Sequence, residues 1–307
     1  MKFARILLLV IPWFFSACTP NEGGKVQVVA TTTMVADMAR ALLSEVENVE
    51  LTTLMAPGVD PHTYNLPARS IAKLDGADII LYSGLKLEGR TEELYQSRAG
   101  NAVVLEVASS VPSGDLIVSE GFEGHPDPHV WGDPRIWLKC IDAVVAALSE
   151  KFPNDRGTIE QNADAYRQEL VELHHWATLR TSQIPEANRI LITSHDAFNY
   201  FGKAYGLEVI GIQGISTESE ASGADMSKAA ELIQERAIKA VFVESSVNGA
   251  TIERLAQDTG ATIGGELFSD SLGPAGEEET FDGQTYDVGT YVGMLKHNVN
   301  TIVEALQ

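Results

Sequence analysis

The stretch VQVVATTTMVADMARALLSE, residues 26–45, contains the pattern that decides the fold. Its opening residues are apolar and rich in valine, which predicts a buried strand. From residue 34 onward, apolar side chains recur at helical spacing, which predicts a helix directly after the strand. A strand followed at once by a helix is the building unit of a parallel α/β sheet, so this stretch sets the fold class.

The same alternation of strands and helices occupies most of the remaining chain. It covers residues 49–107 and resumes over residues 189–269. A segment rich in Gly, Glu and Asp at 272–287 is expected to be a loop, and a last helix is expected within 288–307. We therefore expect an α/β protein with two lobes, each a mostly parallel sheet flanked by helices.

A long segment without proline separates the two regions of alternation. Residues 154–184 are polar and amphipathic, and they lie between Pro153 and Pro185. At about 1.5 Å per residue, a helix of this length extends on the order of 45 Å, more than the width of one small domain. We therefore predict a single spine helix that joins the lobes. The expected division is an N-terminal α/β lobe at 25–152, the spine helix at 153–185 and a C-terminal α/β lobe at 186–307.

Composition limits the classes of partner. The chain has 307 residues, 44% of them hydrophobic, which is enough for two compact domains. Its 43 acidic and 22 basic residues give a formal net charge of -21. A surface this negative repels a phosphate backbone, so nucleic acid is excluded as a partner. The acidity is compatible with a protein that handles cations, although most acidic soluble proteins do not.

The first 18 residues, MKFARILLLVIPWFFSAC, are typical of an export signal. Their apolar run is too short to cross a bilayer, which takes about 20 residues. We expect a signal peptide at 1–17, and Cys18 after two small residues resembles the lipobox of bacterial lipoproteins, although Phe15 replaces the usual leucine. An acylated Cys18 would anchor the protein to a membrane through a tether at 18–24. An ordinary signal peptide with an incidental cysteine is the alternative.

The tripeptide Asp-Pro-His occurs twice, at 60–62 and at 127–129, each time with an aromatic residue two positions later. The proline fixes its own φ and restricts the preceding aspartate to extended geometry. Each histidine is therefore expected to leave a stiff loop in a defined direction. Imidazoles held in this way are suited to binding a metal ion.

Four polar residues lie at or beyond the ends of predicted strands, where ligands bind in open α/β sheets: His62, His129, His195 and Asp270. Three imidazoles and one carboxylate form a donor set suited to zinc or another divalent transition metal. Each residue also has a plainer interpretation. The histidines could be turn or core residues, and the aspartate could cap a turn. The spacing alone leaves both interpretations open.

Nearly the whole chain, from VVATTTMVADMA at 28–39 to YVGMLKHNVNTIVEAL at 291–306, resembles the TroA-like zinc and manganese receptors of bacterial ABC importers. The resemblance rests on LMAPGVDPHTY at 54–64, DPHVWGDP at 127–134, ITSHDAFNYFGKAYGL at 192–207, GIQGISTESEAS at 211–222 and GGELFSDSLG at 264–273. It implies a solute-binding protein that catalyses no reaction, captures one divalent ion and delivers it to a membrane permease driven by an ATPase.

The resemblance also implies the ligands. Carried over to matching positions, they are His62, His129, His195 and Asp270, and the third position varies in the family between histidine and glutamate. Histidine at 195 favours zinc as the transported ion, with manganese as the alternative. A lipid-anchored monomer in the cell envelope is expected. Three acidic residues, Glu218, Glu220 and Glu244, could support the site or be structural, and the sequence does not decide between these roles.

Two other function classes compete with transport. A zinc hydrolase would bind the ion with three histidines and keep a position open for water, but Asp270 as a fourth ligand would close that position. The chain also has no HExxH arrangement and no Walker motif. A surface adhesin is the second alternative, and it would leave the four convergent residues without a role.

Overall fold

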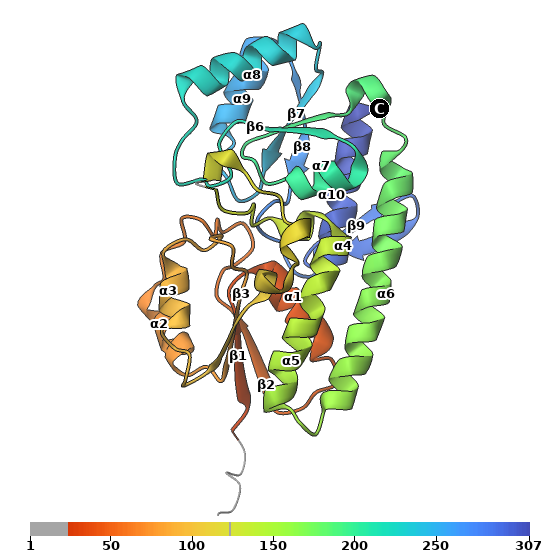
Figure 1. The fold of residues 1–307 in the computed structure, drawn as a ribbon. Helices are drawn as coiled ribbons and strands as arrows, with labels where there is room; N and C mark the ends of the chain where they lie inside the picture. Colours follow the sequence, from red (N-terminus) through yellow and green to blue (C-terminus); the bar gives the residue numbers. More distant parts are fainter. Residues whose placement is uncertain (1–23, 123) are drawn as a thin grey trace, which may run out of the picture.

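The computed structural model describes residues 24–122 and 124–307, and strands and helices alternate along them as predicted (Figure 1). Cys18 and the expected signal peptide lie outside the described residues. We refer to residues 24–152 as the N-terminal half and to residues 186–307 as the C-terminal half. In the described part of the chain no helix is both long enough and apolar enough to cross a membrane.

The N-terminal half contains one parallel sheet with strand order β2-β1-β3-β4. Its strands are β1 (Val26–Ala30), β2 (Val49–Thr53), β3 (Ile79–Tyr82) and β4 (Val103–Glu106). Its helices are α1 (Thr33–Leu42), α2 (Ala68–Asp75), α3 (Thr91–Gln96), α4 (Pro134–Trp137) and α5 (Ile141–Lys151). Single 3₁₀ turns lie at Val107–Ser110, Ser113–Asp115, Glu120–Phe122, Val130–Gly132 and Leu138–Cys140.

Successive side chains of the central strands pack on opposite faces of this sheet, because a strand alternates with a period of two. Val28 and Ile79 join the main core with α1 and α5. Val29 and Ile80 join a smaller core with α2 and α3 on the other face. Figure 1 shows these two helix pairs on opposite sides of the sheet. Burial on both faces explains why β3 is apolar at every position and why β1 has three consecutive apolar residues, Val28, Val29 and Ala30.

The C-terminal half contains two parallel strand pairs, β5 with β6 and β7 with β8, and β5 lies beside β7. The strands are β5 (Ile190–Thr193), β6 (Glu208–Gly211), β7 (Ala240–Glu244) and β8 (Thr262–Leu267). The helices are α7 (Asn199–Tyr205), α8 (Gly223–Glu235), α9 (Ala250–Thr259) and α10 (Tyr291–Leu306), with a 3₁₀ turn at Glu186–Asn188. The predicted fold class, two parallel α/β regions with a long helix, is confirmed.

The expectation of a plain loop at 272–287 is wrong. This segment forms an antiparallel hairpin of β9 (Glu278–Phe281) and β10 (Gln284–Asp287). Asp282 and Gly283 connect the strands, and both have positive φ, 47° and 74°. Asp-Gly is a preferred pair for such a two-residue turn. The sequence therefore contained a hairpin signal that its polar composition obscured.

The predicted spine helix is present as α6 (Arg156–Thr181), a few residues shorter at each end than the proline-free segment. It packs against α1, α4 and α5 of the N-terminal half and against α7 and α10 of the C-terminal half. Its buried residues recur every three or four positions: Ile159, Ala163, Tyr166, Leu170, Leu173, Ala177 and Thr181. All of them except Thr181 belong to one hydrophobic core that contains residues of both halves. The two halves therefore share a core along α6.

Hydrogen bonds between residues far apart in sequence reinforce this shared core. The Leu272 amide donates to Thr33 Oγ1 at 2.8 Å, and the Tyr291 amide donates to Asp37 Oδ2 at 3.1 Å. The Tyr291 hydroxyl donates to the Trp131 carbonyl at 2.6 Å. These contacts attach Leu272, which follows β8, and the start of α10 to α1 and to the 3₁₀ turn before α4. The C-terminal segment thus completes the N-terminal half.

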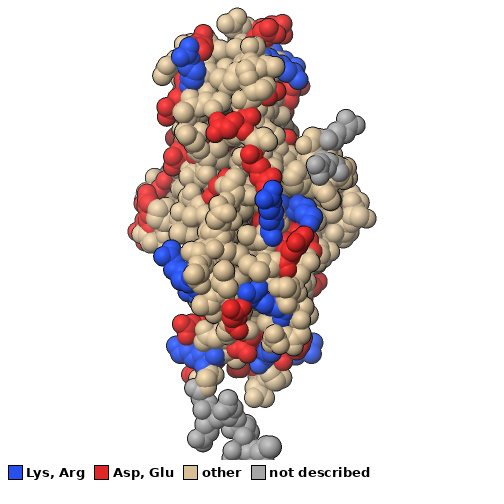
Figure 2. All heavy atoms as spheres, turned by 90° about the vertical axis from the view of Figure 1, so that its left-hand side faces the viewer, with Lys and Arg blue, Asp and Glu red and all other residues tan. Residues whose placement is uncertain are grey.

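Acidic and basic side chains are interspersed on the face shown in Figure 2, with no extended patch of one sign. This face is the left-hand side of Figure 1. The excess of acidic residues therefore does not form one continuous patch on this face.

The shared core can be tested with two neighbouring residues of α6. Leu170 is fully buried, whereas Val171 is 59% exposed. We expect Leu170→Ala to lower the free energy of unfolding by about 2–5 kcal/mol, because it opens a cavity in the core. Val171→Ala should change it by less than about 0.5 kcal/mol. Urea denaturation followed by circular dichroism measures both, and equal effects of the two variants would contradict the shared core.

Candidate metal centre

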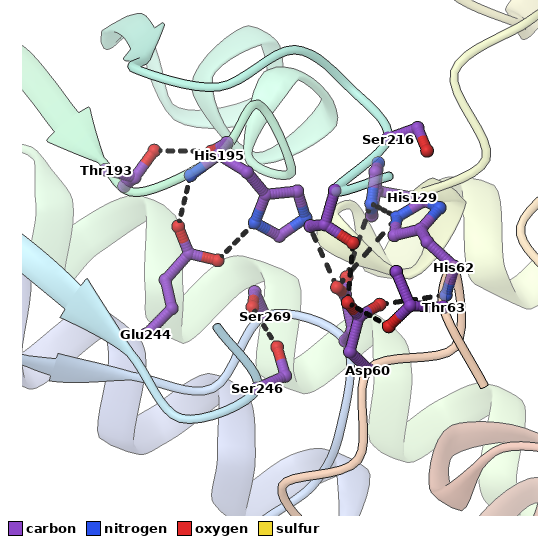
Figure 3. Close-up of polar contacts among 12 residues, drawn as sticks. Asp60, His62, Thr63, His129, Thr193, His195, Ser216, Glu244, Ser246 and Ser269 are labelled. Carbon is purple, nitrogen blue, oxygen red and sulfur yellow. Dashed lines mark hydrogen bonds and ion pairs between the residues drawn. The ribbon is translucent and has the colours of Figure 1, made fainter. Parts of the chain in front are cut away.

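Four side chains from four separate segments meet between the two halves (Figure 3). His62 follows β2 and His129 lies in the long connection after β4, while His195 follows β5 and Asp270 follows β8. All four residues are buried, and one potential ligand atom of each lies within 4.8 Å of the others. The carboxyl ends of parallel strands in both halves thus face one point, as expected for α/β sheets.

The three imidazoles direct their Nε2 atoms towards the Asp270 carboxylate. Asp270 Oδ1 lies 3.2 Å from His129 Nε2, and Asp270 Oδ2 lies 3.2 Å from His195 Nε2. Asp270 Oδ2 is 4.0 Å from His62 Nε2, and the Nε2 atoms of His62 and His129 are 3.4 Å apart. This arrangement provides three nitrogen donors and one oxygen donor around a single point, which suits a tetrahedral ion such as zinc.

Polar atoms at this point lack ordinary partners. Both oxygens of Asp270 and the Nε2 atom of His195 are buried, and among the described residues their close polar neighbours are only the other members of the cluster, without a well-formed hydrogen bond. Buried polar atoms in native proteins are normally hydrogen-bonded, and each exception requires an explanation. A bound cation would satisfy the carboxylate and the imidazoles together. The chemistry of the donor set therefore fits a divalent metal ion.

The aspartate of each Asp-Pro-His tripeptide fixes the main chain of its histidine. Asp60 Oδ1 accepts a hydrogen bond from the His62 amide at 2.8 Å, and Asp127 Oδ1 accepts one from the His129 amide at 2.9 Å. An aspartate that bonds the amide two residues later forms an Asx-turn. The stiffness predicted from proline alone is therefore reinforced by the aspartate, whose role was not recognised in the sequence.

Two of the histidines have a carboxylate on their second ring nitrogen. Asp127 Oδ1 lies 2.8 Å from His129 Nδ1, and Glu244 Oε2 lies 2.6 Å from His195 Nδ1. Glu244 Oε1 also accepts a hydrogen bond from the His195 amide at 2.8 Å. Such partners orient the ring and make the other nitrogen a stronger ligand. Glu244, which the sequence left undecided, contacts the site because β7 lies beside β5.

The carboxylates control protonation of the two rings. Burial opposes protonation of His129, but Asp127 and Asp270 outweigh burial and raise the pKa of His129 to about 9. Burial likewise opposes protonation of His195, but Glu244 and Asp270 raise its pKa well above the usual value. Burial lowers the pKa of His62 to about 3, so this ring is neutral. Burial would raise the pKa of Asp270, but His195 and His129 hold it well below the usual value.

A cavity of about 540 Å³ opens beside His62. Its lining includes Lys86 from the N-terminal half and the exposed carboxylates of Glu218 and Glu220 from the C-terminal half. The latter two residues therefore lie at the mouth of the site, and neither belongs to the four-residue cluster. His62 is the only member of the four-residue cluster that lines this cavity.

The chain can be compared with known proteins. A model of the ZnuA family, described as the periplasmic component A of a zinc-uptake complex, matches residues 28–305. The chain is 39% identical over 311 residues to the manganese-binding lipoprotein MntA of Bacillus subtilis (strain 168), covering 98% of this chain and 97% of that protein. It is 40% identical over 288 residues to the zinc-binding protein TroA of Treponema pallidum (strain Nichols), covering 92% and 89%.

Comparison of structures agrees with these sequence matches. The solved structure of the periplasmic zinc binding protein TroA from Treponema pallidum resembles this chain with a TM-score of 0.86, covering 92% of this chain and 99% of that structure at 40% identity. The family model and these relatives each span nearly all of the chain. The chain therefore belongs to the ZnuA/TroA family of periplasmic metal-binding proteins.

Proposed function

We propose that this protein captures one divalent transition-metal ion, zinc in preference to manganese, and delivers it to the membrane permease of an ABC importer. The observation that carries the proposal is the buried convergence of His62, His129, His195 and Asp270 within 4.8 Å. Relatives support both ions, because one is named a zinc-binding protein and another a manganese-binding lipoprotein. In this proposal the ion is cargo, held between the halves and later released.

The family argues against the competing hydrolase. Its members are solute-binding proteins of ABC transporters and not enzymes. The chemistry of the site agrees, because four protein ligands around a tetrahedral ion leave no open position for an attacking water. Hydrolysis of ATP belongs to a separate subunit of such a transporter, so the proposed partners are a permease and its cytoplasmic ATPase.

We further propose how the chain is organised for this task. Residues 25–152 and 186–307 would act as the two lobes, joined by the spine at 153–185, and the protein would act as a monomer. Residues 1–17 would be removed on export, and Cys18 would carry the lipid anchor. The lipobox resemblance supports this anchor, and so do relatives such as MntA, which are named lipoproteins.

The anchor can be tested by replacing Cys18 with alanine. Because Cys18 is far in sequence from the four candidate ligands, we expect Cys18→Ala to move the protein from the membrane fraction to the soluble fraction without loss of metal binding. Membrane fractionation and mass spectrometry of the mature protein measure the change, and Cys140→Ala is the matched control. A variant that still partitions with lipid at the acylated mass would refute the anchor.

Protons should compete with the ion for the ligands. The pKa of His129 is about 9 and that of His195 is well above its usual value, so both rings bind protons at neutral pH when no ion is present. An ion that displaces these protons binds more tightly as pH rises, and more weakly as pH falls through and below these pKa values. Ion affinity should therefore begin to fall at a pH above about 5–6, the range in which ordinary histidine ligands become protonated.

Titration calorimetry of metal-free protein tests this dependence. At pH 7 we expect one ion per chain and the release of up to two protons, so affinity should change by as much as about 100-fold per pH unit. Measurements in two buffers of different ionisation enthalpy count the released protons. Two tight sites per chain, or an equal affinity at pH 6 and pH 8, would contradict the proposed ligand set.

His195 should determine the preference between zinc and manganese. A glutamate would replace a nitrogen donor by a second negative oxygen, which suits the harder manganese ion better. We expect His195→Glu to retain both ions and to narrow the zinc-to-manganese affinity ratio by roughly tenfold, equal to about 1.4 kcal/mol. Competition titrations measure the ratio, while circular dichroism checks the fold.

The structure indicates a necessary control for this variant. A glutamate at 195 would lie close to Glu244, which now contacts the His195 ring at 2.6 Å. Like charges at this distance disfavour each other. The double variant His195→Glu with Glu244→Gln removes that repulsion and isolates the ligand effect. An unchanged or wider ratio in both variants would show that His195 does not set selectivity.

A further inference from the structure

Both Asp-Pro-His loops contact the opposite half through their aspartate. Asp127 Oδ2 accepts a hydrogen bond from Asn199 Nδ2 at 3.1 Å, and Asp60 Oδ2 accepts one from Thr217 Oγ1 at 2.5 Å. Asn199 and Thr217 both belong to the C-terminal half. Each aspartate thus connects the main chain of a candidate ligand on one side of the cleft to a polar side chain on the other side.

The two loops differ in how they hold the imidazole. Asp127 contacts both the His129 amide and the His129 ring. Asp60 contacts the His62 amide but not its ring, and no described residue forms a hydrogen bond with His62 Nδ1. The position of the His62 ring therefore depends on its main chain. That main chain depends in turn on the Asp60 carboxylate, which Figure 3 shows beside His62.

His62 also lies where the ion meets solvent. It lines the 540 Å³ cavity, whose wall includes Ile215, Ser216 and Glu218 from the segment that carries Thr217. His129 and His195 do not line this cavity. Among the three histidines, His62 is therefore the one that an arriving ion reaches first and a departing ion leaves last.

We propose that Thr217 is a positioning residue for ion retention. Its hydrogen bond to Asp60 forms only when the two halves are close, and Asp60 in turn fixes the His62 main chain. Closure of the cleft thus places the ligand that faces the exit cavity, and opening of the cleft releases it. The loop that contains Asp60 and His62 forms one further hydrogen bond across the cleft, in which the Gly58 amide donates to Ser271 Oγ at 2.9 Å. This inference rests on the proposed function, because it concerns the rate at which the bound ion leaves.

The chain contains a matched control for this contact. Thr63 Oγ1 donates to the same oxygen, Asp60 Oδ2, at 2.9 Å, but Thr63 belongs to the same loop as His62. Valine in place of threonine keeps the shape and removes the hydroxyl. Thr217→Val therefore removes the contact across the cleft, and Thr63→Val removes only a contact within the loop. Thr217→Ser keeps the hydroxyl and should preserve the contact.

The experiment measures zinc release from the loaded full chain into excess chromophoric chelator by stopped flow. We expect Thr217→Val to accelerate release about tenfold, as for loss of a hydrogen bond to a charged acceptor. Thr217→Ser and Thr63→Val should stay within about twofold of the unmodified protein. Circular dichroism of the metal-free protein checks that each variant folds. Thr217→Ala serves as a second deletion of the hydroxyl if Thr217→Val does not fold.

Three results would overturn the inference: release from both Thr217→Val and Thr217→Ala at the unmodified rate, equal acceleration by Thr63→Val, or no recovery in Thr217→Ser. The first would show that the contact does not restrain the ion. The second would show that Asp60 needs both donors regardless of the cleft. An unmodified protein that binds no divalent ion would instead refute the proposed function, and with it this inference.

Discussion

The structure depends on one buried carboxylate that faces three imidazoles. Asp270 is 1% exposed, and its oxygens lie 3.2–4.0 Å from the three Nε2 atoms. A charge buried in this way is costly unless it is paired. Positive charge on the His129 and His195 rings can compensate it, and so can a metal ion. Protons and metal ions are therefore interchangeable occupants of the same electrostatic site, and the surrounding carboxylates, Asp127 and Glu244, adjust the balance between them.

Parallel sheets are well suited to building such a site. Their strands all deliver side chains at one edge, and two sheets that face each other can contribute ligands from both sides. Here each half supplies two of the four residues. None of the four lies inside a strand or an α-helix, so the loops beyond the strands position the ligands while the packed core holds the loops in place. The shared core along α6 limits how far the halves can separate, which suits a protein that holds a single small ion and has no large ligand to enclose.

Much of the fold and the neighbourhood of the candidate site could be predicted from the sequence, because both depend on patterns within short segments. Apolar strands followed by amphipathic helices predicted the sheets, and polar residues after strands predicted the neighbourhood of the site. Contacts between residues far apart in sequence were harder to predict. Glu244 contacts His195 only because β7 lies beside β5, and Thr217 reaches Asp60 from 157 positions away in sequence. The hairpin at 278–287 was missed for a different reason, since its Asp-Gly turn lay within a polar segment.

The attachment of Leu272 and of the start of α10 to α1 affects how the chain folds during synthesis. Thr33 and Asp37 receive their hydrogen bonds from residues 239 and 254 positions later. Because synthesis proceeds from the N-terminus, these partners emerge from the ribosome last. Contacts of such high sequence separation form slowly, and the N-terminal half lacks part of its core until they form. The nascent chain therefore stays incompletely folded throughout most of its translation. A chain in that state would suit threading across a membrane, as the proposed export requires.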